Sequence, residues 1–110
     1  MKLLARIAVP ASFFLFFGVA HADTHTAVVR TLQVHPPTNG GYVQLAGVPN
    51  FSGGVCNSPW AIGRLDDQNF MVYIWPALMS AKNQGKSVTI TVSGCVGNYP
   101  LIEWIQVNES

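Results

Sequence analysis

The chain has 110 residues, of which 49% are hydrophobic and only 10% are charged, and its formal net charge is +1. This length is enough for one small domain. A nearly neutral chain without a cluster of basic side chains lacks the electrostatic attraction on which nucleic-acid binding depends, so we expect no nucleic-acid partner.

The first 22 residues have the pattern of a secretory signal peptide. Lys2 and Arg6 give a positive start, residues 7–20 are apolar, and Ala20 and Ala22 form a small-x-small cleavage site. The apolar run has about 14 residues, fewer than the roughly 20 that a membrane span needs, so no membrane span is expected. We predict cleavage near Ala22 and a secreted or periplasmic domain at 23–110. The alternative is an uncleaved amphipathic anchor.

Three strands are predicted next. Residues 27–34 are rich in β-branched side chains, and the Pro, Asn and Gly residues of 36–41 interrupt the strand before 42–47 resume it. This pattern predicts a β-hairpin with a longer loop. Residues 48–59 are predicted to be a loop, and 60–63 a short third strand.

A helix is predicted at 68–83, where the apolar spacing becomes helical. Asp66 or Asp67 stands where an N-cap belongs, and its negative charge suits a helix N-terminus. Gly85 is suited to the position just after the helix. We interpret both aspartates as helix caps and not as an acid pair.

The predicted helix has two unusual features. Pro76 in its middle should kink it, and the alternative is a strand at 70–75 with a helix that begins at Pro76. The apolar residues also form two stripes, whereas a surface helix needs only one to meet its own core. The first stripe is Phe70, Tyr73, Ile74, Ala77 and Ala81, and the second is Met71, Trp75, Leu78 and Met79.

Two further strands complete the domain. Residues 87–93 alternate strictly, 94–100 are predicted to be a tight loop, and 101–107 the last strand. The order β-β-β-α-β-β predicts a mainly β fold with one helix, an OB-fold-like five-stranded barrel.

Cys56 and Cys95 are the only cysteines, and export takes them to an oxidising compartment. A disulfide between them would close a loop of about 40 residues and stabilise the domain by roughly 3–4 kcal/mol. The rival reading is a metal site. It lacks ligands, because His25 and His35 are distant in sequence and two thiolates do not complete a zinc shell. We therefore predict the disulfide and no metal.

Several segments together resemble a known protein family. They are 41–47, the Cys-x₃-Trp run of Cys56 to Trp60, 77–89, and Gly94-Cys95 followed by a closing hydrophobic strand. These segments resemble the binding (B) subunits of bacterial A-B-five toxins, in the group of the subtilase cytotoxin and pertussis-like subunits, and their small secreted relatives.

The resemblance implies an OB-fold protomer with a disulfide, a homopentamer with a helix-lined pore, recognition of cell-surface glycans, and a toxin A subunit as a possible partner. Family glycan sites include a hydroxyl side chain near the start of the first strand, where Thr26 falls. They also include an acidic residue late in the second strand, where this chain has Ala46.

Sugar recognition needs an aromatic face and a few hydroxyl or amide groups. Two loops carry such residues, and the predicted disulfide would bring the loops together. The predicted ligand-binding residues are Thr26, Asn50, Phe51, Ser52, Asn98 and Tyr99. Trp60 and Trp104 are predicted to be core residues, and His25 and His35 exposed and inert.

No nucleophile, base and orienting group occur in a recognisable motif, so no enzyme activity and no cofactor are predicted. We expect a non-enzymatic binding subunit that recognises glycans. The alternative is a protein-binding module of the same fold, such as a periplasmic inhibitor or assembly factor. The second helix stripe predicts an oligomer interface at Met71, Trp75 and Met79, in a ring that is most simply a pentamer. For Trp75 the alternative is a place in the core of its own chain.

Overall fold

The structure is a computed structural model, and it describes residues 22–109. The predicted signal peptide lies outside these residues, except for Ala22. The described elements are, in chain order, β2 (Ala22–His35), a 3₁₀ turn (Pro36–Thr38), β3 (Gly40–Leu45), β4 (Phe51–Ser52), β5 (Asn57–Ser58), β6 (Ala61–Arg64), a π-helical turn (Phe70–Ile74), α1 (Trp75–Gln84), β7 (Ser87–Val96) and β8 (Tyr99–Val107).

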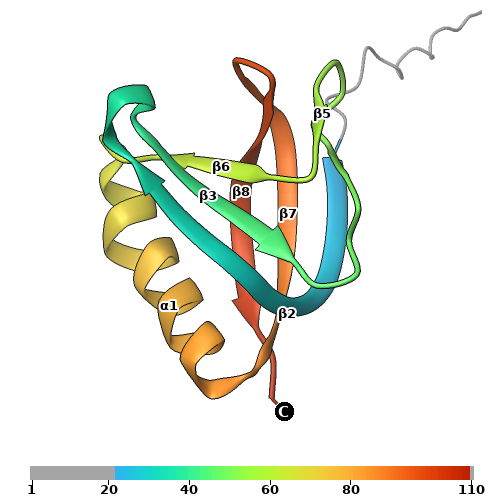
Figure 1. Cartoon of the computed structure of the whole chain (residues 1–110), viewed down its shortest axis with the longest axis vertical. Helices are drawn as coiled ribbons and strands as arrows, with labels where there is room; N and C mark the ends of the chain where they lie inside the picture. Colours follow the sequence, from blue (N-terminus) through green and yellow to red (C-terminus); the bar gives the residue numbers. More distant parts are fainter. Residues whose placement is uncertain (1–21, 110) are drawn as a thin grey trace, which may run out of the picture.

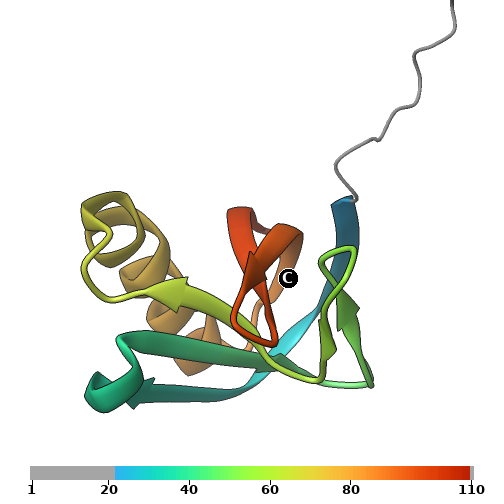
Figure 2. The ribbon, with the colours of Figure 1, turned by 90° about the horizontal axis from the view of Figure 1, so that it is seen from above.

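Five strands form a closed barrel in the order β2-β3-β6-β8-β7, and β7 pairs with β2 to complete it. All neighbouring pairs are antiparallel except β6 and β8, which run parallel where Ile62 faces Leu101. Figure 1 shows α1 lying along one side of the barrel, and Figure 2 shows the strands from above. The fold is thus mainly β with one helix, as predicted.

The barrel can close because β2 bends in the middle (Figure 1). Its first half pairs with β7 and its second half with β3. The pairing register shifts between Val29, opposite Leu45, and Thr31, opposite Gln44, so that Arg30 is an extra residue. Such a β-bulge bends a strand and increases its twist. One strand can therefore serve two faces of the barrel.

Strand alternation fills the barrel with apolar side chains. On β7, for example, Val88, Ile90 and Val92 are fully buried, because successive side chains of a strand point to opposite faces. The core consists of Val29, Val43, Leu45, Phe51, Ala61, Phe70, Trp75, Leu78, Ala81, Val88, Ile90, Val92 and Ile102.

The predicted element order is wrong in one place. Residues 48–59, predicted to be a loop, contain the small antiparallel hairpin of β4 and β5. Five strands therefore precede the helix instead of three. The predicted loop at 94–100 is also shorter than expected, since β7 continues to Val96 and β8 begins at Tyr99. The missed strands β4 and β5 have two residues each, too few for a recognisable alternation of apolar and polar side chains.

The predicted disulfide is confirmed. Cys56 and Cys95 are bonded, with their Cα atoms 6.0 Å apart. Cys56 lies just before β5, and Cys95 lies in β7. The bond therefore fastens the β4–β5 hairpin to the barrel wall.

The predicted helix ends are also confirmed. The Oδ1 atom of Asp67 accepts hydrogen bonds from the backbone N–H groups of Asn69 (2.9 Å) and Phe70 (3.3 Å). Gly85 follows the last helical residue with a φ of 66°, a left-handed conformation that glycine adopts without strain. The aspartate prediction is thus resolved in favour of Asp67 as the cap.

A π-helical turn corrects the two-stripe prediction. The N–H of Trp75 donates to the carbonyl of Phe70, five residues earlier, so this turn holds one more residue than an α-helical turn. The wider turn comes just before Pro76, whose ring would clash with a carbonyl in a regular helix. The extra residue also rotates the side chains after the turn relative to those before it. As a result, the buried side chains share a single face of the helix: Phe70, Trp75, Leu78 and Ala81.

The alternative of a strand at 70–75 is wrong, because this segment is helical throughout. Gly63 of β6 explains how the helix start can lie so close to the barrel. A Cβ atom at this position would collide with the ring of Phe70.

Candidate functional site

An open pocket of about 230 Å³ lies where the β2–β3 turn, the approach to β6 and the start of β8 meet. It differs from a second and more open pocket, beside Arg30 and residues 47–49, because three aromatic side chains line it. The lining residues are Gln33, His35, Thr38, Tyr42, Trp60 and Tyr99.

The three aromatic rings are arranged around Tyr42. Its ring meets that of Tyr99 edge to face, with centroids 5.0 Å apart, and that of Trp60 in the same manner at 6.3 Å. Edge-to-face packing is a favourable arrangement of aromatic pairs. Tyr42 is mostly buried, whereas Tyr99 and Trp60 are half-buried. The rings thus form a supported wall with part of its surface open to solvent.

Gly40 allows the Tyr42 ring to take its position. A Cβ atom at Gly40 would lie 2.7 Å from Cε2 and 2.8 Å from Cζ and the hydroxyl oxygen of Tyr42. Gly40 belongs to the Asn-Gly-Gly turn that the sequence marks as a strand break. The same residues therefore turn the chain and make room for the pocket wall.

Polar groups enter the pocket from the β2–β3 turn. The Oγ1 atom of Thr38 lies 2.8 Å from the Tyr42 hydroxyl and 3.0 Å from Nδ1 of His35, and it donates to the His35 carbonyl at 3.2 Å. Gln33, two residues before His35 on β2, adds a side-chain amide. The pocket therefore combines aromatic carbon surface with hydroxyl, imidazole and amide groups.

The turn itself is fixed from the neighbouring β6. The backbone N–H of Leu65 donates to the carbonyl of Asn39 at 3.0 Å. Hydrogen bonds from the side chains of Asn39 and Arg64 hold the pKa of Asp66 below its ordinary value. Asp66 thus links the turn that carries Thr38 to the end of β6.

The pocket contains only one of the predicted ligand-binding residues, Tyr99. Its neighbour Asn98 is exposed at the tip of the β7–β8 turn. One prediction is corrected: Trp60, predicted to be core, lines the pocket. His35 is exposed, as predicted, and it lies in the same pocket. Tyr42 was missed, because a tyrosine in a regular strand gives no sign of which face will be open.

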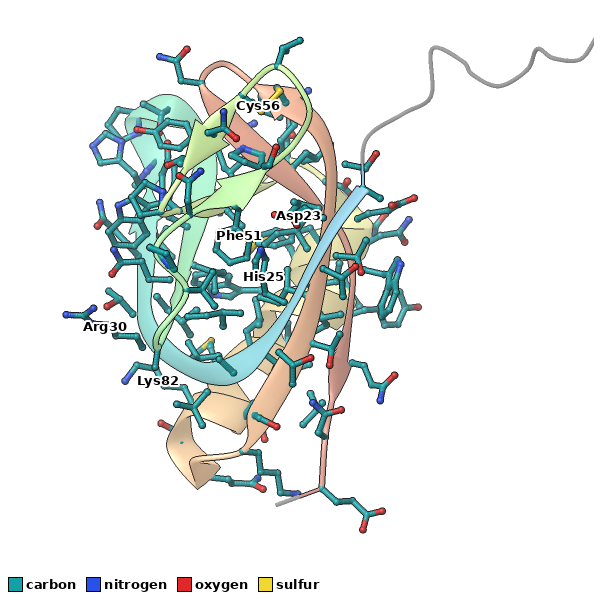
Figure 3. All side chains as sticks on the ribbon, turned by 90° about the vertical axis from the view of Figure 1, so that its right-hand side faces the viewer. Asp23, His25, Arg30, Phe51, Cys56 and Lys82 are labelled. Atoms are coloured by element: carbon teal, nitrogen blue, oxygen red, sulfur yellow. A yellow bond between two sulfur atoms is a disulfide. The ribbon has the colours of Figure 1, made fainter. Side chains whose placement is uncertain are left out.

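The second predicted loop does not contribute a ligand-binding aromatic. Phe51 is 0% exposed and belongs to the core, which corrects its prediction as a binding residue. Phe51 is the first residue of β4, and the ring of His25 on β2 meets its ring edge to face at 5.2 Å (Figure 3). Asp23 accepts hydrogen bonds from the backbone N–H of Ser52 (2.9 Å) and from His25 Nε2 (2.8 Å).

The other predicted ligand-binding residues lie outside the aromatic pocket. The Ser52 N–H is engaged by Asp23, and Asn50 is exposed without being among the pocket-lining residues. Thr26 lies on the outer face of β2, where its hydroxyl bonds that of Thr89 at 2.8 Å. None of these three residues lies in the aromatic pocket.

The predicted oligomer interface is corrected at its central residue. Trp75 is only 8% exposed and packs in the core of its own chain. Met71 is partly buried against the same core, and Met79 is exposed. Trp104, predicted to be core, is 46% exposed on β8. Its strand position alone did not predict burial, because the outer face of a barrel strand also meets solvent.

Within residues 22–109, no three His, Cys, Asp or Glu side chains lie close enough together to hold a metal ion. The helices of this described part are too short or too polar to cross a membrane. Comparison with protein-family models, curated proteins and solved structures found no match. What the site can bind is therefore inferred from its own geometry.

Proposed function

We propose that this chain is an exported, non-enzymatic sugar-binding module on an OB-fold-like barrel, and that the Tyr42–Trp60–Tyr99 pocket is its binding site. The observation that carries the proposal is the convergence of three aromatic rings with hydroxyl, amide and imidazole groups in one open pocket. The C–H face of a sugar ring packs on aromatic carbon, and its hydroxyl groups need polar partners.

The size and chemistry of the pocket support binding without catalysis. Its volume of about 230 Å³ lies below the roughly 300–1,000 Å³ of pockets for drug-sized ligands, so it suits one sugar residue of a glycan. Glycoside hydrolysis uses a pair of carboxylates flanking the scissile bond. None of the six residues that line the pocket carries a carboxylate.

Export is the second part of the proposal. Cleavage after Ala22 would leave β2 intact from Asp23, whose carboxylate is bonded to Ser52 and His25. An intramolecular disulfide is typical of proteins from oxidising compartments. N-terminal sequencing of the protein recovered outside the cytoplasm should give Asp-Thr-His-Thr, and an intact Met1 would contradict the proposal.

We also propose that the module assembles with copies of itself, as in a ring. With Trp75 in the core, the apolar residues left on the outer helix surface are Val72, Tyr73 and Met79, and Tyr73 is 71% exposed. Avidity from several weak sugar sites would raise the apparent affinity by up to roughly 10²–10⁴-fold. Light scattering should give an oligomer mass that Met79→Lys reduces, and a monomer mass at micromolar concentration would contradict it.

A glycan array tests the binding proposal with matched controls. Tyr99→Ala and Trp60→Ala should abolish saturable binding, because each removes an aromatic face of the pocket. Trp104→Ala removes an exposed aromatic ring outside the pocket, and it should leave binding unchanged. Equal losses in all three variants, or no glycan bound by the wild type, would refute the proposed site. A pull-down that recovers one stoichiometric protein partner would favour the alternative, a protein-binding module.

A further inference from the structure

The hydrogen bonds around Thr38 determine which polar atoms of the pocket remain for a ligand. A hydroxyl group has one proton to donate, whereas a carbonyl oxygen can only accept. All three contacts of Thr38 can be hydrogen bonds at once only if the hydroxyl donates to the His35 carbonyl and its oxygen accepts from both other neighbours. These are the Tyr42 hydroxyl at 2.8 Å and His35 Nδ1 at 3.0 Å.

The donors of Tyr42 and His35 are therefore both used inside the protein. The Tyr42 hydroxyl gives its proton to Thr38 and keeps lone pairs for a ligand. In the neutral imidazole of His35, a proton on Nδ1 leaves Nε2 as an acceptor. Toward the ligand, then, these two side chains present acceptors only. Among the other lining residues, the Gln33 amide and the Tyr99 hydroxyl can donate or accept, and the Trp60 indole N–H can only donate.

The pocket also lacks a fixed charge. The six lining residues include no Lys, Arg, Asp or Glu. On the adjoining strand β6, Arg64 lies opposite Gly40. Its guanidinium is already bonded to the carboxylate of Asp66, at 3.1 and 3.2 Å. The carboxylate or sulfate group of an acidic sugar binds most strongly to a cationic donor, and none of the six lining residues is a Lys or Arg.

We infer that the pocket selects a neutral sugar residue that donates two of its hydroxyl protons, one to Tyr42 and one to His35, in preference to an acidic sugar. This inference rests on the proposed sugar-binding function. Thr38 acts as a positioning residue, because it holds the protons of both side chains away from the ligand.

The first experiment compares charge classes by titration at about pH 8, where an ordinary histidine is neutral. The probes are methyl galactoside and methyl glucoside on the neutral side, with methyl glucuronide and the methyl glycoside of sialic acid on the acidic side. At least one neutral probe should bind ten times more tightly than both acidic ones. Tighter binding of an acidic probe would overturn the inference while leaving the proposed function intact. No binding of any probe would overturn both.

The second experiment tests the direction of the hydrogen bonds with analogues of the neutral probe that binds. At each ring hydroxyl in turn, a deoxy analogue removes donor and acceptor, whereas a deoxyfluoro analogue removes only the donor. At two positions the deoxyfluoro analogue should lose affinity as strongly as the deoxy analogue, by at least tenfold. If the fluorine restores affinity at both positions, the pocket donates to the sugar and the inference is wrong.

Variants connect these losses to the named residues. Tyr42→Phe should weaken the parent sugar about tenfold and cancel the deoxyfluoro penalty at one position, while the exposed control Trp104→Phe, outside the pocket, should change neither. Thr38→Val frees the Tyr42 proton, so the same deoxyfluoro penalty should shrink. A penalty that stays unchanged in both pocket variants would contradict the assignment, and circular dichroism establishes that each variant is folded.

Discussion

Two loops of this protein place an aromatic residue directly after an asparagine, and the fold uses the two aromatic residues in opposite ways. Phe51 follows Asn50 and is fully buried in the core, whereas Tyr99 follows Asn98 and lines an open pocket. The two loops are also joined, since the disulfide connects the β4–β5 hairpin to β7 near its turn into β8.

The difference arises from the surroundings of each aromatic residue. The β4–β5 hairpin is held down on the barrel by the disulfide and by the bond from Ser52 to Asp23, so Phe51 is pressed inward against His25 (Figure 3). The β7–β8 turn extends from the barrel at the same end as the β4–β5 loop (Figure 1), and the Tyr99 ring meets that of Tyr42 edge to face. The two aromatic residues therefore differ in what they pack against: Phe51 packs into the barrel core, whereas Tyr99 packs against another residue of the pocket wall.

The largest expected effect is a difference in stability between alanine variants of Phe51 and Tyr99. Phe51→Ala should lower the free energy of unfolding by about 3–5 kcal/mol, because it leaves a cavity in the closed core. Tyr99→Ala should cost about 1–2 kcal/mol, since its ring is only partly buried, but should abolish sugar binding. Urea unfolding and titration measure both. The smaller truncation Phe51→Leu is the control and should cost less than Phe51→Ala, because it keeps more of the buried apolar volume. Equal stability losses in the two alanine variants would end the distinction.

The next prediction concerns removal of the Cys56–Cys95 disulfide. The pair Cys56→Ser, Cys95→Ser should lose about 2–4 kcal/mol of stability, because the unfolded chain is no longer constrained. Reduction of the wild type should shift its urea midpoint to that of the double variant and leave the variant unchanged. Sugar affinity of the folded variant should persist, since none of the six pocket-lining residues belongs to the hairpin. A lost pocket in a folded variant would show that the two loops are coupled.

A third prediction concerns the support behind the pocket wall. Gly40→Ala places a methyl group within 2.8 Å of the Tyr42 ring, so the ring must move, at a cost of about 1–3 kcal/mol. Sugar affinity should fall at least tenfold. In a Tyr42→Ala background the same substitution should cost nothing measurable, because the clash partner is gone. A full cost in that background would locate the strain in the backbone instead of the ring.

Local patterns in the sequence predicted much of the fold. The 27–47 hairpin, the Asp67 cap, the Gly85 stop and the disulfide each depend on neighbouring residues or on the only two cysteines. The π-helical turn was not predicted, because it results from Pro76 and the packing of Phe70 together. Likewise, Tyr42 and Trp60 become a pocket wall only through contacts between distant strands, which no local pattern contains.

The smallest expected effect is a pH dependence of the turn that carries Thr38. Hydrogen bonds from Asn39 and Arg64 lower the pKa of Asp66 in the folded protein, whereas in the unfolded chain it has the ordinary value of about 3.9. The stabilisation is therefore present above that value and is lost as the pH falls through the lower folded pKa. Because Asp66 is exposed, solvent screening keeps the effect small. Wild type should be slightly more stable to urea than Asp66→Asn at neutral pH and indistinguishable from it once Asp66 is protonated, whereas a constant difference at all pH values would mean that the carboxylate charge is not involved.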